Sequence, residues 1–240
     1  MKTRHILISG LVIFSVLFIG LQVMKYEMYA SFVRAAIVIL FTLLYYNQTN
    51  TLRSYFFLFL ATFALADIIG LSFWFIELST LNFDYTYYIC NSLYIMSYIF
   101  LIIMVLKSMN LKDVIIKLPA HIVILVVLEI FCVTIVTDTT KHELSIYQYS
   151  LEFLYNAVIM SLLTLSVINY IYKVDKNSMN LLIASLFIVF SEMIQMAYYY
   201  VLEINVLNVL CSLFLVIAFL FFYLQEILEE TEELNSLKEI

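Results

Sequence analysis

The stretch ATFALADIIGLSFWF, residues 61–75, places a carboxylate, Asp67, near the middle of an apolar run long enough to cross a lipid bilayer. An ionisable side chain at the centre of a membrane helix costs about 2.5–3.5 kcal/mol on insertion scales. We therefore expect Asp67 to have a buried partner, a function, or both.

The composition of the whole chain agrees with a membrane location. Hydrophobic residues make up 65% of the 240 residues, charged residues only 12%, and the mean hydropathy is +1.02. Soluble proteins carry about 25% charged residues. Apolar runs continue for about 20 residues, whereas the strands of a membrane barrel alternate polar and apolar residues in units of about 10. The fold class predicted is an all-α polytopic membrane protein, and the lack of a basic stripe argues against a nucleic-acid partner.

Runs of roughly 18 to 25 apolar residues predict eight transmembrane helices. Their approximate ranges are 5–24, 29–46, 54–77, 85–106, 118–137, 146–172, 178–202 and 205–227. We interpret residues 1–227 as one transmembrane domain and residues 228–240 as an acidic tail.

Basic residues predict the orientation of these helices. If the N-terminus is cytoplasmic, nine Lys and Arg residues fall in cytoplasmic segments and two, Lys25 and Lys141, in outer segments. Lys and Arg are enriched in cytoplasmic loops. We therefore expect both termini in the cytoplasm and a bacterial-type inner (cytoplasmic) membrane as the location.

A possible internal repeat relates the third and seventh predicted helices. A shift of 125 residues sets residues 54–78 over residues 179–203 and places Asp67 over Glu192. Two four-helix halves forming a parallel repeat would hold these carboxylates at equivalent depths. The similarity of two apolar helices could also be coincidental, but the matched acid favours a repeat.

The depths of the ionisable residues predict a shared pocket. At 1.5 Å per residue, Asp67 and Glu192 lie about 15 Å below the outer ends of their helices. Glu129, Glu152 and Arg34 fall in the same half of the membrane. Because charged side chains facing lipid are costly, we expect most of these groups to point into a polar pocket, where Arg34 pairs with an acid.

The order and spacing of short motifs over nearly the whole chain resemble the YhhN family of lysoplasmalogenases, which are eight-helix membrane proteins. SFVRAAIVILFTLLYY, FLATFALADIIGLSFW, ICNSLYIMSYIF, FLYNAVIMSLLTLS, LFIVFSEMIQMAYYY and FFYLQEIL carry the resemblance. Arg34-Ala35 stands where the family has Lys-Pro, and Ala66-Asp67 where it has Gly-Asp. Asn91 with Tyr94 replaces His-x-x-Tyr, and Ser191-Glu192 replaces Ser-Asp. Tyr155, Met160 and Gln225 are kept.

The resemblance implies hydrolysis of the vinyl ether bond of a lysophospholipid. Such a reaction needs a proton donor and a base, and paired carboxyls divide these roles in glycoside hydrolysis. We expect Asp67 and Glu192 to be catalytic, with Glu192 as the acid and Asp67 as the base or the reverse. Substrate-binding residues implied are Arg34, Asn91, Tyr94 and Tyr155.

No cofactor or metal is expected. His5, His121 and His142 lie at the ends of predicted helices, and Cys90, Cys132 and Cys211 lie in apolar segments. Neither set has the spacing of metal ligands.

Other functions remain open at this point. Arg34, Asp67 and Glu192 could form a network that only fixes helix packing. The acidic C-terminal segment has leucines at nearly helical spacing, so it could form a homodimer or dock a cytoplasmic partner, as in a sensor or scaffold with a lipid pocket. A transporter is a third possibility, although the scarcity of Gly and Pro argues against broken helices.

Overall fold

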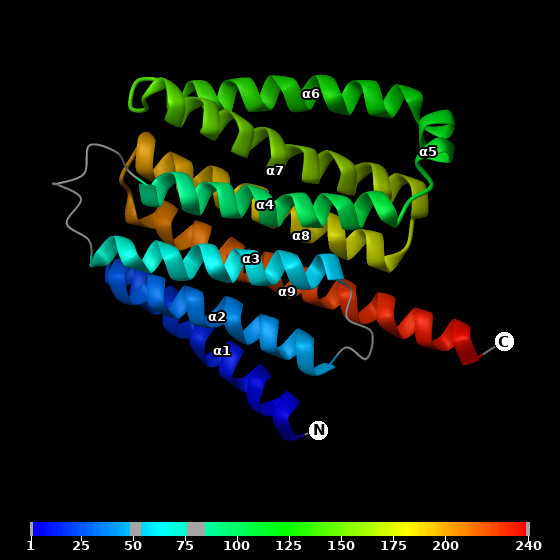
Figure 1. Cartoon of the computed structure of the whole chain (residues 1–240), viewed down its shortest axis with the longest axis horizontal. Helices are drawn as coiled ribbons and strands as arrows, with labels where there is room; N and C mark the ends of the chain where they lie inside the picture. The colour runs from blue at the N-terminus through cyan, green and yellow to red at the C-terminus, as the bar shows by residue number, and fades with distance from the viewer. Residues whose placement is uncertain (1, 49–53, 76–84, 239–240) are drawn as a thin grey trace.

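The computed structural model describes residues 2–48, 54–75 and 85–238 (Figure 1). Within these ranges all regular structure is helical, and seven helices are long and apolar enough to cross a membrane. Helices suit hydrocarbon because they pair their backbone polar groups internally, and an unpaired group there costs several kcal/mol. The chain is an all-helical polytopic membrane protein.

The helix bounds follow the predicted ranges closely. The first half holds α1 Lys2–Val23, α2 Glu27–Gln48, α3 Ser54–Leu71, η1 Ser72–Trp74 and α4 Tyr85–Lys107. The second half holds α5 Leu111–Lys117, α6 Pro119–Asp138, α7 Ile146–Lys173, α8 Lys176–Tyr200 and α9 Asn205–Lys238.

Three details differ from the sequence-based ranges. The apolar part of α3, Tyr55–Leu71, is shorter than the seven long helices, and residues 76 and 77 of the predicted range lie outside the described residues. The short helix α5 was not predicted. α9 continues as one helix past the predicted domain boundary at residue 227.

Long helices that follow one another in the chain run in opposite directions along the bundle, and both termini lie at the same end (Figure 1). We call this end the Lys107 end, because α4 finishes there. The opposite end, where α1 turns into α2 and α8 into α9, is the Glu27 end. Pro119 begins α6. Backbone N–H groups in the first turn of a helix have no acceptor within the helix, so a proline there costs no helical hydrogen bond.

The helices form a closed ring. Going round it, α1, α2, α3, α4, α7, α8 and α9 each pack on the next, and α9 packs back on α1. α6 packs on α7 and lies outside this ring (Figure 1).

The buried face of α3 is aromatic toward the Lys107 end and polar toward the Glu27 end. Phe56, Phe59 and Phe63 of α3 are buried at helical spacing. The Phe219 ring of α9 lies 5.7 Å from Phe59 and 5.0 Å from Phe63, measured between centroids. One turn beyond Phe63, the same face of α3 carries Asp67.

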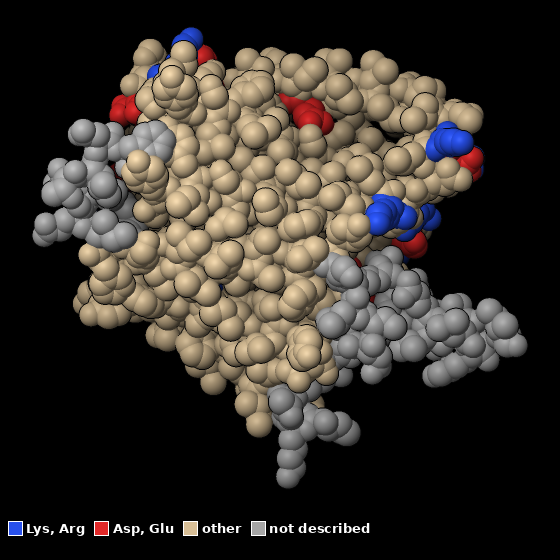
Figure 2. Space-filling view, viewed as in Figure 1, with Lys and Arg blue, Asp and Glu red and all other residues tan. Residues whose placement is uncertain are grey.

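The surface matches a lipid environment. Many large apolar side chains are exposed on the long helices. Charged side chains on the face in Figure 2 gather mostly toward the two ends of the bundle, and uncharged residues cover most of the surface between them.

Candidate functional site

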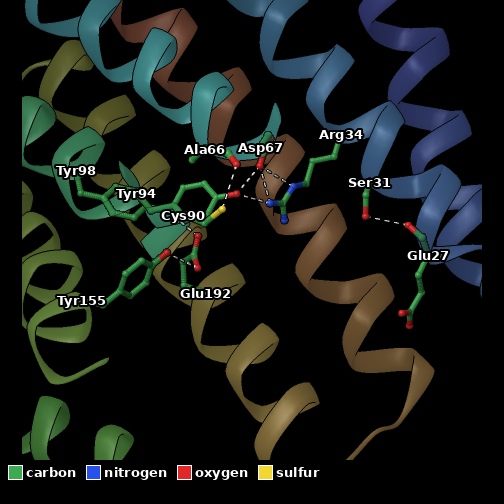
Figure 3. A network of polar contacts seen from close by, with 10 residues as sticks. All are labelled: Glu27, Ser31, Arg34, Ala66, Asp67, Cys90, Tyr94, Tyr98, Tyr155 and Glu192. Atoms are coloured by element: carbon green, nitrogen blue, oxygen red, sulfur yellow. Dashed lines mark hydrogen bonds and ion pairs between the residues drawn. The ribbon is translucent and has the colours of Figure 1, made fainter. Parts of the chain in front are cut away.

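Asp67 is the centre of a buried ion pair. Its side chain is 1% exposed, and its Oδ1 accepts hydrogen bonds from Arg34 Nη2 at 2.6 Å and Nε at 3.1 Å. The Tyr94 hydroxyl donates to the same Oδ1 at 2.5 Å (Figure 3). Oδ2 is also buried but has no hydrogen-bond partner among the described residues. The expected pairing of Arg34 with an acid is confirmed.

Glu192 is held by two tyrosines. The Tyr98 hydroxyl donates to its Oε1 at 2.6 Å, and the Tyr155 hydroxyl donates to its Oε2 at 2.8 Å. Tyr94 and Tyr98 are one turn apart on α4 and therefore lie on one helix face. Through them α4 connects Asp67 on α3 with Glu192 on α8 (Figure 3).

The two carboxyls differ in their electrostatic surroundings. Arg34 forms an ion pair with Asp67, but within the described parts of the chain no Lys or Arg nitrogen lies within 4.0 Å of the Glu192 carboxyl. A tyrosine hydroxyl can donate or accept, so the partners of Glu192 suit either its charged or its neutral form. The surroundings of Asp67 suit the charged form.

Two adjoining cavities meet at these groups. One of about 230 Å³ is lined by Glu192, Tyr94 and Tyr155, and the other, of about 370 Å³, is lined by Asp67, Ser31 and Thr86. Both share the lining residues Arg34, Tyr87, Asn91, Gln195 and Tyr199. Tyr199 is 64% exposed near the end of α8, so the cavities extend toward the Glu27 end.

A third acid lies at the first cavity. Glu152, near the start of α7, is 7% exposed, and its Oε2 accepts a hydrogen bond from the Tyr87 hydroxyl at 2.8 Å. Glu152 and Glu192 both line the cavity of about 230 Å³. The site is therefore more acidic than a two-carboxylate pair.

The structure brings the six predicted site residues together. Asp67, Arg34 and Tyr94 form one cluster, and Tyr155 contacts Glu192 in the other. Asn91 lines both cavities, and its amide donates to the Tyr87 carbonyl of its own helix at 2.9 Å.

Sequence reasoning missed Tyr98, Gln195 and Tyr199. Each follows a predicted residue at helical spacing, Tyr98 after Tyr94 and the other two after Glu192, and this periodicity was the available signal. Glu129, which the depth argument grouped with the pocket acids, lies apart and accepts a hydrogen bond from the Ser161 hydroxyl.

Among the described residues, no group of three or more His, Cys, Asp or Glu side chains is arranged to hold a metal ion. Comparisons with protein-family models, with curated proteins and with solved structures found no match.

Proposed function

We propose that the protein is a lysoplasmalogenase-like membrane hydrolase that cleaves the vinyl ether bond of a lysophospholipid. The observation that carries the proposal is the pair of carboxyls, Asp67 and Glu192, which have different partners and line adjoining cavities. The resemblance to the YhhN family rests on the same residues.

The reaction adds one water across the vinyl ether. Glu192 delivers a proton to the vinyl carbon remote from the ether oxygen, which leaves a cation shared by the other vinyl carbon and that oxygen. Water attacks this carbon and loses a proton to Asp67, giving a hemiacetal. The hemiacetal breaks its bond to the glycerol oxygen, which takes up the hydroxyl proton, and releases a fatty aldehyde. Water in the cavities then carries the proton from Asp67 back to Glu192.

The contacts support this division of roles. Arg34 stabilises a charged Asp67, and Asp67 lines the larger cavity, where its carboxylate can take up a proton from the attacking water. Glu192 has only hydroxyl partners in that part of the chain, so it can carry the proton to be donated.

Lipid access requires an orientation in the membrane. We propose eight crossings, with α3 and η1 as the third, and both termini in the cytoplasm, as the distribution of Lys and Arg predicts. The Glu27 end then faces outward, and the site takes its lipid from the outer half of the bilayer. The repeat of two four-helix halves stays a prediction.

Aldehyde release tests the hydrolase. Purified protein in detergent is given a lysoplasmalogen, and fatty aldehyde is measured for the wild type, Asp67→Asn and Glu192→Gln. Positioned acids and bases contribute about 10²- to 10⁴-fold, so we expect each variant to lose at least about 100-fold in rate.

The matched control is Asp138→Asn, which makes the same change at an exposed acid at the end of α6. It should release aldehyde at the wild-type rate, and an ester-linked lysophospholipid should release none. Absence of aldehyde from folded wild-type protein would refute the proposal.

α9 favours a second candidate, a non-catalytic membrane sensor or scaffold. This helix carries Asn208, Cys211 and Ser212, which line a small cavity beside Arg34, and continues unbroken to Lys238. Lipid bound at the site could therefore shift the C-terminal segment, which docks a partner or a second copy. If lysophospholipid binds without cleavage and changes the rate of disulfide crosslinking through Leu234→Cys, the sensor is favoured. An unchanged crosslinking rate would count against it.

A further inference from the structure

α6 is the most peripheral of the long helices. It packs on α7 outside the ring of helices, and its outward side is apolar. The exposed residues on it include Val123, Ile124, Val127, Ile130, Phe131 and Ile135. Such a face suits lipid and, by itself, predicts no partner.

One carboxylate interrupts this apolar environment. Glu129 lies in the middle of α6 and is only half-buried. Its Oε1 accepts a hydrogen bond from Ser161 of α7 at 2.5 Å, and that is its one hydrogen bond within the described part of the chain. In Figure 2, acidic atoms are visible amid uncharged surface in the region of α6 and α7. This carboxylate is therefore poorly satisfied at the depth where lipid is least polar.

Two other acids of the membrane interior accept more hydrogen bonds. Asp67 has a cation and a tyrosine, and Glu192 has two tyrosines. A carboxylate at the bilayer midplane typically faces the protein interior or pairs with another group, because exposure to lipid is costly. Because α6 lies outside the ring, a further partner for the Glu129 carboxyl would approach from the lipid side.

We propose that another membrane protein docks on this surface with a transmembrane helix that carries a Lys or Arg at the bilayer midplane. The Glu129 surface comprises Leu125, Glu129 and Cys132 of α6 with Ala157 and Ser161 of α7, which are all partly exposed. Charge complementarity selects the basic residue, and small side chains let a helix approach closely.

A second copy of the chain does not supply this partner. The same surface on a second copy would bring a second Glu129 and no cation. In the described ranges, the basic residue at membrane depth is Arg34, and it is already paired with Asp67 on α3. The proposal is independent of the hydrolase, because Glu129 does not line the cavities of the site.

Designed peptides test the docking. Donor-labelled protein is reconstituted into phosphatidylcholine vesicles with acceptor-labelled leucine–alanine transmembrane peptides that have either Arg or Leu at the centre. We expect energy transfer with the Arg peptide to exceed that with the Leu peptide at least fivefold, after correction for random proximity. This comparison needs no variant of the protein.

Two variants locate the contact. Glu129→Gln should abolish the preference for the Arg peptide, whereas Glu143→Gln, the same change in the turn after α6, should keep it. Thermal unfolding in detergent shows whether both variants are folded. Equal transfer to the two peptides, or an unchanged preference in folded Glu129→Gln, would overturn the proposal. Energy transfer between protein molecules that vanishes in Glu129→Gln would also overturn it, because a second copy would then be the partner.

Discussion

At the scale of single residues, Asp67 is kept in an apolar helix because its inward position gives it partners. It follows Phe56, Phe59 and Phe63 on the buried face of α3, so its side chain meets Arg34 and Tyr94 rather than lipid. Removing one member of a buried ion pair costs more than removing both, because the remaining charge has no compensation.

This asymmetry predicts the outcome of a double-mutant cycle. Arg34→Gln should lower the free energy of unfolding by an amount on the order of 3 kcal/mol, since it leaves the Asp67 charge unpaired. Adding Asp67→Asn should recover more than half of that loss. Thermal unfolding of the four proteins in one detergent measures the coupling. If the losses of the two single variants add up to the loss of the double variant, the ion pair contributes no coupling to stability.

The residues of the site were predictable to different degrees. Asp67, Glu192 and Arg34 stand out because a charge in an apolar run is rare and costly. Tyr98 does not stand out, because tyrosine is abundant in this chain and is also expected at membrane surfaces. Only the folded arrangement, which brings Tyr98 of α4 to Glu192 of α8, shows that the Tyr98 hydroxyl binds Glu192.

At the scale of helices, polar caps fix the ends that lie outside the lipid. Ser145 and Gln148 form a capping box at the start of α7, and Asp175 and Ser178 form another at the start of α8. Val174, with φ of 54°, turns the chain between α7 and α8. These caps satisfy backbone N–H groups that the first turn of a helix leaves free.

The cap at Asp175 predicts a pH effect on stability. Partial burial raises the pKa of this carboxyl, but hydrogen bonds from Ser178, including one from its N–H at 2.7 Å, outweigh the burial, so the pKa lies below its ordinary value of 3.8. The stabilisation is therefore present above the pKa of the unfolded chain and is lost as the pH falls through the lower pKa of the folded protein.

Asp175→Asn keeps a capping side chain but has no charge to titrate. Its melting temperature in detergent should fall less steeply than that of the wild type as the pH is lowered toward 3. Asp175→Ala should lose about 1 kcal/mol at neutral pH, because the cap itself is removed. Parallel acid profiles for the wild type and Asp175→Asn would contradict this role of the carboxylate.

Helix ranges could be predicted because long apolar runs between polar segments are unambiguous. The range of α5 could not be predicted, because Lys112, Asp113 and Lys117 give this segment the composition of a connecting loop. Its helix depends on the cap at Asn110 and on the burial of Val114, which a hydropathy profile does not detect.

At the scale of the whole molecule, the arrangement of the ring could not be predicted from hydrophobic periodicity. In lipid, the outward face of a helix is as apolar as the inward one: on α3, Leu65 and Ile68 are exposed while Phe59 and Phe63 are buried. The sequence therefore indicated which helices carry charges but not which helices are neighbours. The polar pocket was predicted from the depths of the ionisable residues in the membrane. The connection between Asp67 and Glu192 through the tyrosines of α4 was not predicted.

The arrangement predicts access to the pocket from one side of the membrane. In a Cys90→Ser background, Ser31→Cys should react with a membrane-impermeant thiol reagent added outside intact cells, because Ser31 lines the cavity that extends to the Glu27 end. Lys173→Cys, at the Lys107 end, should react only after the membrane is permeabilised. The opposite pattern would reverse the proposed orientation, and labelling of Ser31→Cys from both sides would show that the pocket crosses the bundle.

The aromatic stretch on the buried face of α3 has a consequence for proton access. Phe56, Phe59 and Phe219 are buried between the carboxyls and the Lys107 end, whereas the cavities at the carboxyls extend toward the Glu27 end, so we expect protons to enter the pocket from the Glu27 end. With the Glu27 end outward, the acidity of the exterior, rather than that of the cytoplasm, would set the charge of the pocket. A cell could keep such a titrating site in an energised membrane without short-circuiting its proton-motive force.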